Sequence, residues 1–173
     1  RSPSHRRRVF RRRLAAERLE ERLALATVTW TGGGGSLAWG TSANWDTGAL
    51  PGNGDDVVIP DLGQASVTYN NVFGGSTFNT LVVDVPFIIA GFVNPLNITT
   101  EAIFNSSLTQ GNSQIGGPGD IIINGLYTWN TSTHGGTGTT FINGGLVIPN
   151  NAAQHTLGRT MEIASSASLE GGP

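Results

Sequence analysis

The chain of 173 residues contains no cysteine and no lysine, and charged residues make up only 13% of it. Without cysteine, neither a disulfide framework nor a thiolate metal site is available. After Arg22 the only arginine is Arg159. This excludes nucleic-acid binding by that part of the chain, because phosphate groups need a stripe of basic residues. A polysaccharide lyase is disfavoured for a similar reason, since it needs basic side chains around a uronate carboxylate.

Long uninterrupted runs are missing as well. From Thr27 to Gly158 no stretch free of glycine, proline and asparagine exceeds seven residues, so helices of ordinary length are excluded there. Residues 1–26 hold no apolar run of the ~7 to 15 residues that a signal peptide needs. They also fall short of the ~20 apolar residues that cross a bilayer, and we expect no integral membrane segment.

Charge and glycine divide the chain near residue 27. Residues 1–26, the head, carry nine arginines against three glutamates, a net charge of +6, and no glycine. Residues 27–173, the body, carry one arginine against nine carboxylates, a net charge of −8, and all 25 glycines. Within the body we assign 27–60 to an N-terminal cap with the first strand and 61–173 to repeated coils. The ending SLEGGP (168–173) lacks a polar cap, and we expect a truncation there.

The head is predicted to form a short basic α-helix over residues 9–25. Helix formers dominate it, and the pairs Phe10/Leu14 and Leu19/Leu23 each lie four residues apart on one face. A basic helix with an apolar side suits binding to anionic lipid or a role in export. An arginine-rich arm for nucleic acid is the weaker alternative, because nothing downstream supports it.

Part of the head resembles a known motif. The stretch LEERLAL (Leu19–Leu25) is similar to the LEPR-XLL motif near the start of large secreted or surface proteins of planctomycetes and other Gram-negative bacteria. It departs from that motif at Glu21 and Ala24. The resemblance implies a leader that contacts the membrane or the export machinery, and a secreted or cell-surface location.

Seven short runs in the body are rich in valine, isoleucine, threonine or aromatic residues and are bounded by turn residues, as β-strands are. They cover 56–60, 66–70, 80–84, 95–99, 120–124, 139–143 and 146–150. Ile98, Ile123 and Ile148 lie 25 residues apart in such runs, and a fixed period is typical of stacked coils. We predict an all-β parallel β-helix, or β-solenoid, of about six coils. A β-sandwich is the alternative, which antiparallel pairing would reveal.

The start of the body has the composition of a cap. Trp30, Trp39 and Trp45 lie within sixteen residues around a run of four glycines, which suits a loop-rich cover over the open end of the first coil. The segment 30–60 resembles the entry segment of autotransporter-passenger and haemagglutinin-like repeat proteins, with its W-x-G-G…N-W…P-G-x-G-D-D-V-V-I pattern. The segment 119–163 is similar to their G-x-G-T-T-x-I-x-x-G-G-x-L-x-I coils. The resemblance implies a bacterial secreted or surface β-solenoid.

Carboxylates are the first candidates for chemistry. The densest acidic cluster comprises Asp55, Asp56 and Asp61. Three roles are open for Asp55 and Asp56: a turn cap for one with the other in solvent, a Ca²⁺ site that uses one of them with loop carbonyls, and catalysis. A glycoside hydrolase needs two or three carboxylates on one face, and Asp84, Glu101 and Asp120 are the mid-chain candidates. Neither of the two separations between them matches the period of the isoleucines, so we do not expect them on a common face.

Two histidines and two aromatic residues complete the candidates. His134 and His155 lie in turn-like stretches with no metal-binding spacing, and we expect exposed or hydrogen-bonded loop side chains. Tyr127 and Trp129 share a strand, where they form either a sugar-stacking surface or part of the core.

The sequence therefore assigns no catalytic, cofactor-binding or metal-binding residue. We interpret the chain as a non-enzymatic, secreted or cell-surface β-solenoid with a structural or adhesin-like role. Its expected partners are polysaccharide or other cell-surface components. A carbohydrate-binding or carbohydrate-active β-helix, similar to a glycoside hydrolase, is the alternative.

Overall fold

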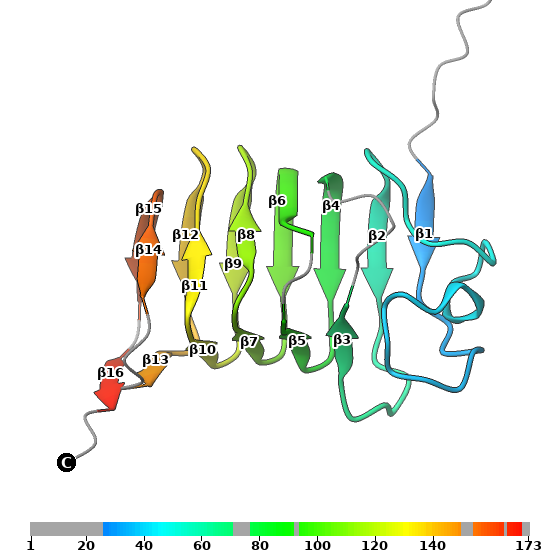
Figure 1. Ribbon diagram of the computed structural model, residues 1–173, viewed down its shortest axis with the longest axis horizontal. Helices are drawn as coiled ribbons and strands as arrows, with labels where there is room; N and C mark the ends of the chain where they lie inside the picture. Colours follow the sequence, from blue (N-terminus) through cyan, green and yellow to red (C-terminus); the bar gives the residue numbers. More distant parts are fainter. Residues whose placement is uncertain (1–25, 71–76, 92–93, 150–153, 165, 171–173) are drawn as a thin grey trace, which may run out of the picture.

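A computed structural model describes residues 26–70, 77–91, 94–149, 154–164 and 166–170, which form a parallel β-solenoid of about five turns. Figure 1 shows the strands in a row along the long axis, with the N-terminal coils at the right and the C-terminal coils at the left. Every pairing between named strands is parallel, so the β-sandwich alternative is wrong. The helix expected over 9–25 lies outside the described residues, and six coils are not confirmed.

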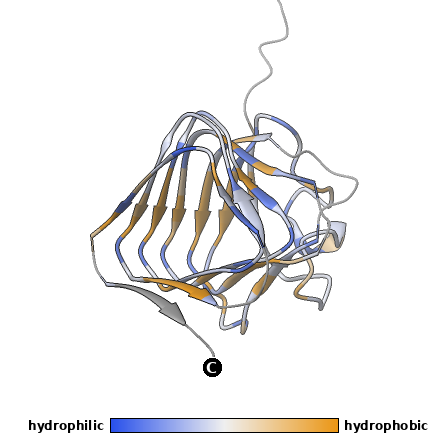
Figure 2. Ribbon diagram, turned by 60° about the vertical axis from the view of Figure 1, so that its left-hand side comes forward, coloured by the Kyte–Doolittle hydropathy of each residue, from blue (hydrophilic) through white to orange (hydrophobic). Residues whose placement is uncertain are grey.

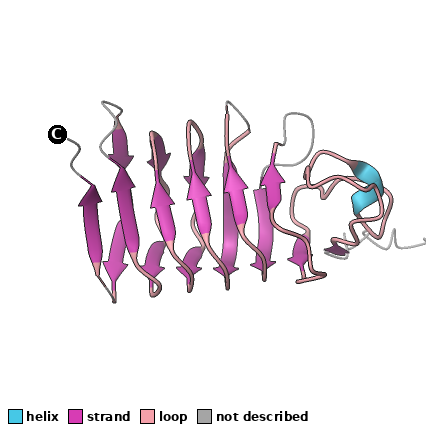
Figure 3. Cartoon of the chain, turned by 90° about the horizontal axis from the view of Figure 1, so that it is seen from below, coloured by secondary structure: helices cyan, strands magenta, loops and turns pink. Residues whose placement is uncertain are grey.

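The strands form two sheets, which we call the first and the second sheet (Figure 3). The first sheet comprises β1 (Thr27–Thr29), β2 (Asp56–Ile59), β4 (Thr77–Val83), β6 (Leu96–Phe104), β8 (Gln114–Gly116), β9 (Asp120–Ile123), β11 (Ser132–His134), β12 (Thr139–Ile142), β14 (His155–Leu157) and β15 (Thr160–Ile163). The second sheet comprises β3 (Val67–Tyr69), β5 (Phe87–Ile89), β7 (Leu108–Gln110), β10 (Tyr127–Trp129), β13 (Leu146–Pro149) and β16 (Ala167–Glu170). All seven predicted runs overlap strands.

The coils differ in length, and the predicted constant period is wrong. Ile123 is aligned with Phe104 on one side and with Ile142 on the other, and not with Ile98 or Ile148. The coil is longest between β1 and β2, where Thr27 is aligned with Asp56, and it is shorter in every later step of the first sheet. The long strand β6 pairs with β8 over its first part and with β9 over its second part, so later coils place two short strands where β6 has one.

Alternation of side chains along each strand fills the interior. Inward positions carry valine, leucine, isoleucine and phenylalanine, which stack on their counterparts in neighbouring coils about 4.8 Å away. One such column consists of Ile59, Val83, Phe104, Ile123 and Ile142, all fully buried. Each buried aliphatic side chain stabilises the fold by about 1.5 to 3 kcal/mol. Figure 2 shows the strands largely orange and the corners between them bluer.

Three tryptophans pack at the N-terminal end of the interior, where Figure 3 shows loops and the short 3-10 helix η1 (Ser42–Asn44) instead of sheet. Trp39 lies at the centre, with its ring centroid 4.7 Å from that of Trp45 and 5.1 Å from that of Tyr69. Backbone hydrogen bonds join Leu37 and Trp39 to Thr68 of β3. The irregular segment therefore covers the outer edge of the second sheet.

Asn44 holds the glycine-rich loop together through hydrogen bonds. Its polar side chain is fully buried. Its carbonyl and amide groups bond to the backbone of Gly34, Ser36 and Ala38 at 2.9 to 3.1 Å. Its main-chain carbonyl accepts hydrogen bonds from Thr31 and Gly32. A buried amide satisfied on both sides fixes a loop that has no regular structure of its own.

Candidate functional site

Three columns of side chains run along the solenoid on the outer face of the first sheet. The acidic column consists of Asp56, Thr80, Glu101, Asp120 and Thr139. The first four are consecutive register partners, and the Thr139 amide donates a hydrogen bond to the Asp120 carboxylate. The apolar stripe consists of Val58, Val82, Ile103, Ile122 and Phe141. The amide ladder consists of Asp84, Asn105, Asn124 and Asn143, just beyond the strands.

The structure corrects one prediction about the carboxylates. We predicted no common face for Glu101 and Asp120, but they are direct register partners on adjacent strands. Their separation in the sequence equals the length of the coil at this point, which is shorter than the predicted period. Asp84 lies in a different column, at the level of Asn105, about 13 Å farther along the strand direction.

The amide ladder links four successive coils through side chains. Asn105 donates to the carboxylate of Asp84, Asn124 donates to Asn105, and Asn143 donates to Asn124, at 2.7 to 2.9 Å. All donors point toward the N-terminal end, where a carboxylate, which only accepts hydrogen bonds, begins the series. We did not predict this ladder from the sequence. Its signal is a polar Asp or Asn directly after an apolar pair, as in VVD, IFN, IIN and FIN.

The cluster Asp55, Asp56 and Asp61 does not converge on one point. The Asp55 carboxylate caps a turn by accepting the Gly52 amide at 2.8 Å, which confirms the turn-cap interpretation. The Asp56 carboxylate accepts Asn79 and Thr80 side chains of the next coil, each at 2.7 Å. Asp61 accepts the Gly63 amide in its own loop. Each carboxylate is thus bonded to protein groups in a different place.

The interior becomes polar toward the C-terminal coils. The columns of Ile89, Ile115 and Ile121 continue as Gln110, His134 and Thr140, all fully buried. Gln110 accepts the hydroxyl of Tyr127 and donates to a backbone carbonyl of the next coil at 3.1 Å. Tyr127 and Trp129 both face this core, so they form no sugar-stacking surface.

The histidines are not where we expected them. His134 lies in β11 and is buried, with Nδ1 3.3 Å from the Thr140 hydroxyl and Nε2 without a hydrogen-bond partner. His155 lies in β14, and its ring centroid is 5.2 Å from that of Trp129. The prediction of loop histidines was wrong because both residues lie in strands, β11 and β14, that were not predicted from the sequence.

Burial controls protonation in this core. Desolvation lowers the pKa of His134 from 6.5 to about 3, and the positive charge of Arg159 adds to the effect. Burial also raises the pKa of the Tyr127 phenol. The Arg159 guanidinium donates to the carbonyls of Gly119, Thr139 and Gly135 at 2.6 to 3.3 Å. Burial lowers its pKa, and the carboxylate of Asp120 opposes that shift.

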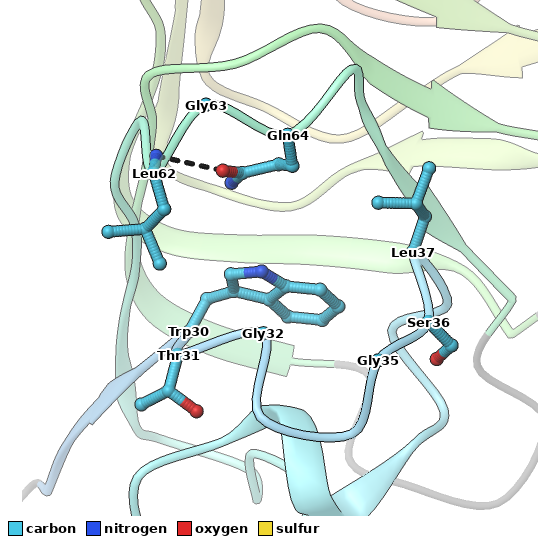
Figure 4. Close-up of a pocket in the computed structure, with 9 residues that line it drawn as sticks. All are labelled: Trp30, Thr31, Gly32, Gly35, Ser36, Leu37, Leu62, Gly63 and Gln64. Atoms are coloured by element: carbon cyan, nitrogen blue, oxygen red, sulfur yellow. Dashed lines mark hydrogen bonds between the residues drawn. The ribbon is translucent and has the colours of Figure 1, made fainter.

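Figure 4 shows a cavity of about 340 Å³ beside the N-terminal loops. The indole of Trp30 forms its floor, and the side chains of Leu37 and Leu62 flank it. The amide of Gln64 is held within its own loop, because it accepts the Leu62 amide at 2.8 Å and donates to the Pro60 carbonyl at 2.9 Å. Apolar and polar groups line this cavity in nearly equal measure, and no side-chain carboxylate or base is among its lining residues.

Comparison of the chain with protein-family models, with curated proteins and with solved structures gives no match. Within the described ranges, no helix is long and apolar enough to cross a membrane. The same part of the chain contains no group of three or more His, Asp or Glu placed to hold a metal ion.

Proposed function

We propose that the chain belongs to a secreted or cell-surface bacterial β-solenoid that acts without catalysis, as a structural or adhesin-like element. The observation that carries this proposal is the use of surface polar groups to join coils. The Asp56 carboxylate and the amide ladder bond to neighbouring coils, and Asp120 accepts the Thr139 amide at 2.8 Å. Groups bonded in this way join one coil to the next, which is a structural role.

The glycoside hydrolase alternative rests on one pair of carboxylates. Glu101 and Asp120 are neighbours, but Asp120 is exposed and both stand on the outer face of a sheet. A general acid for glycoside cleavage needs an environment that shields it from water and keeps it protonated. The outer face therefore suits recognition of a partner better than hydrolysis.

Carbohydrate binding is a second candidate, favoured by a groove on the face formed by β8, β11 and β14. The groove has a volume of about 350 Å³, and only hydroxyl and amide side chains line it. They are Asn112, Ser113, Gln114, Thr131, Ser132, Thr133, Gln154 and Thr156. Such groups both donate and accept hydrogen bonds, as polysaccharide hydroxyls require.

The test combines cellular location and turnover. Antibody against the body is expected to label intact cells of the source organism as strongly as permeabilised cells. The full chain is expected to release no reducing ends from a panel of polysaccharides, and Glu101→Gln is expected to behave like the unmodified chain. Turnover that disappears in Glu101→Gln would show a hydrolase, and labelling that requires permeabilisation would contradict a surface role.

A further inference from the structure

The apolar stripe on the first sheet is unusual for an outer face. Its five members point away from the interior, because they alternate with fully buried neighbours along β2, β4, β6, β9 and β12. Each is half-buried, since its neighbours in the column shield its sides. Outer positions of an exposed sheet are ordinarily polar, and a continuous apolar patch indicates a contact surface.

Charged and polar columns border the stripe on both sides. Asp56, Glu101 and Asp120 lie two residues before members of the stripe, and the amide ladder lies two residues after them. The body as a whole has a net charge of −8. A partner that fits this surface therefore combines apolar side chains with positive charge.

The chain contains a segment with this composition. The head carries nine arginines together with Phe10, Leu14, Leu19 and Leu23. It joins the body at β1, and Thr27 is the register partner of Asp56, so the head leaves the body at one end of the acidic column. We propose that the head binds across the outer face of the first sheet, with its apolar residues on the apolar stripe and its arginines beside the acidic column.

The lengths of the two parts agree. Between Thr27 and Asp120 there are four strand-to-strand steps, about 19 Å at ~4.8 Å each. The helix predicted for residues 9–25 has a length of about 25 Å. A helix of this length that begins beside Thr27 therefore reaches as far along the solenoid as Asp120.

A second copy of the body is a poorer occupant. Two identical faces in contact would bring two acidic columns and two net charges of −8 together. Like charges placed opposite one another across an interface cost several kcal/mol. The inference does not depend on the proposed surface role, because it concerns only how the two parts of the chain interact.

Disulfide trapping in the full chain tests the contact, and the absence of native cysteine makes each introduced pair unambiguous. The test pair is Leu14→Cys with Ile122→Cys on the stripe. The control pair is Leu14→Cys with Thr128→Cys, which points outward from the second sheet in the same coil. Under mild oxidation the disulfide of the test pair is expected to form at least about tenfold faster than that of the control pair. Peptide mapping measures the rate at which each disulfide appears.

The trapping must also depend on charge. Glu101→Gln with Asp120→Asn is expected to slow closure of the test pair, as is ~1 M salt, which shortens the screening length from about 10 Å to about 3 Å. Equal closure of both pairs would overturn the proposal. Crosslinks found only between two chains would show that a second copy supplies the contact, and this too would overturn it.

Trypsin provides an independent readout, because the body contains a single arginine, Arg159, which is 7% exposed. Cleavage within the head therefore reports on its accessibility. Ile103→Ser on the stripe is expected to accelerate this cleavage, whereas Ile88→Ser, an outward position of the second sheet, is expected to leave it unchanged. Equal rates in the two variants and the unmodified chain would contradict binding of the head to the stripe.

Discussion

His134 makes the stability of the solenoid dependent on pH. Its register partners are Ile115 and Leu157, and Leu96 precedes Ile115 in the same column, so an imidazole occupies a place that other coils fill with an aliphatic side chain. Burial lowers its pKa from 6.5 to about 3, with Arg159 contributing in the same direction. Between these two values the unfolded chain binds a proton at this residue and the folded chain does not.

The sign and size of the effect follow from linkage. Because the folded-state pKa is lower than the unfolded one, stability is complete above pH 6.5 and falls as the pH decreases toward 3. Each pH unit below 6.5 costs about 1.4 kcal/mol. At pH 4.5 the loss from His134 is therefore about 2.5 kcal/mol relative to pH 7.5.

Urea unfolding followed by circular dichroism at pH 7.5 and 4.5 measures this loss. In His134→Leu the destabilisation between the two pH values is expected to be smaller by about 2.5 kcal/mol than in the unmodified chain. Ile115→Val serves as the control, because it disturbs the same column without removing a titratable group. An equal pH-dependent loss in His134→Leu and the unmodified chain would refute the reasoning.

Three further substitutions test the stacking of coils, each by its urea midpoint. A Cβ atom at Gly125 would overlap the backbone of Ser106 in the preceding coil, and Gly125→Ala is expected to cost about 3 kcal/mol. Gly111→Ala is its control, since the nearest atom there is 3.7 Å away, and it is expected to be neutral or slightly stabilising. Asn124→Asp removes a donor from the amide ladder and is expected to cost about 1 kcal/mol at pH 7. Arg159→Met leaves three carbonyls without their donor and is expected to cost about 2 to 4 kcal/mol. Unchanged midpoints would show that these contacts do not hold the coils together.

Seven of the strands were predictable from sequence, whereas others, such as β11 and β14, and the way the strands stack were not. In short runs such as 120–124, apolar residues are flanked by turn-forming residues. These residue types alone identify the run as a strand. The period failed because isoleucine occupies different positions in different coils: Ile98 and Ile123 face inward from β6 and β9, but Ile148 belongs to the second sheet. Corner loops of unequal length make the first coil much longer than the later ones, and no single spacing describes them.

The candidate surface was less predictable for the same reason. Glu101 and Asp120 are both visible in the sequence, but their alignment depends on a coil that is shorter than the spacing of the isoleucines suggests. The apolar stripe requires the same register, since Ile103 and Ile122 look like ordinary members of buried strands until the strand alternation places them outside. A pattern of apolar residues thus identifies a strand, but the register of the strand is needed to decide which of its side chains face outward.

The polar residues of the later coils explain how a stack of similar strands keeps one alignment. A displacement by two residues keeps the same face of a strand inward, so apolar packing alone discriminates only weakly against it. Gln110 is different, since it must meet both the Tyr127 hydroxyl and the Thr133 carbonyl of the following coil. Arg159 reaches three carbonyls on two preceding coils. Such a displacement would leave these buried groups unpaired, at a cost of about 1 to 3 kcal/mol for each group. The amide ladder repeats this constraint on the outside, so register is fixed from both faces of the coil wall.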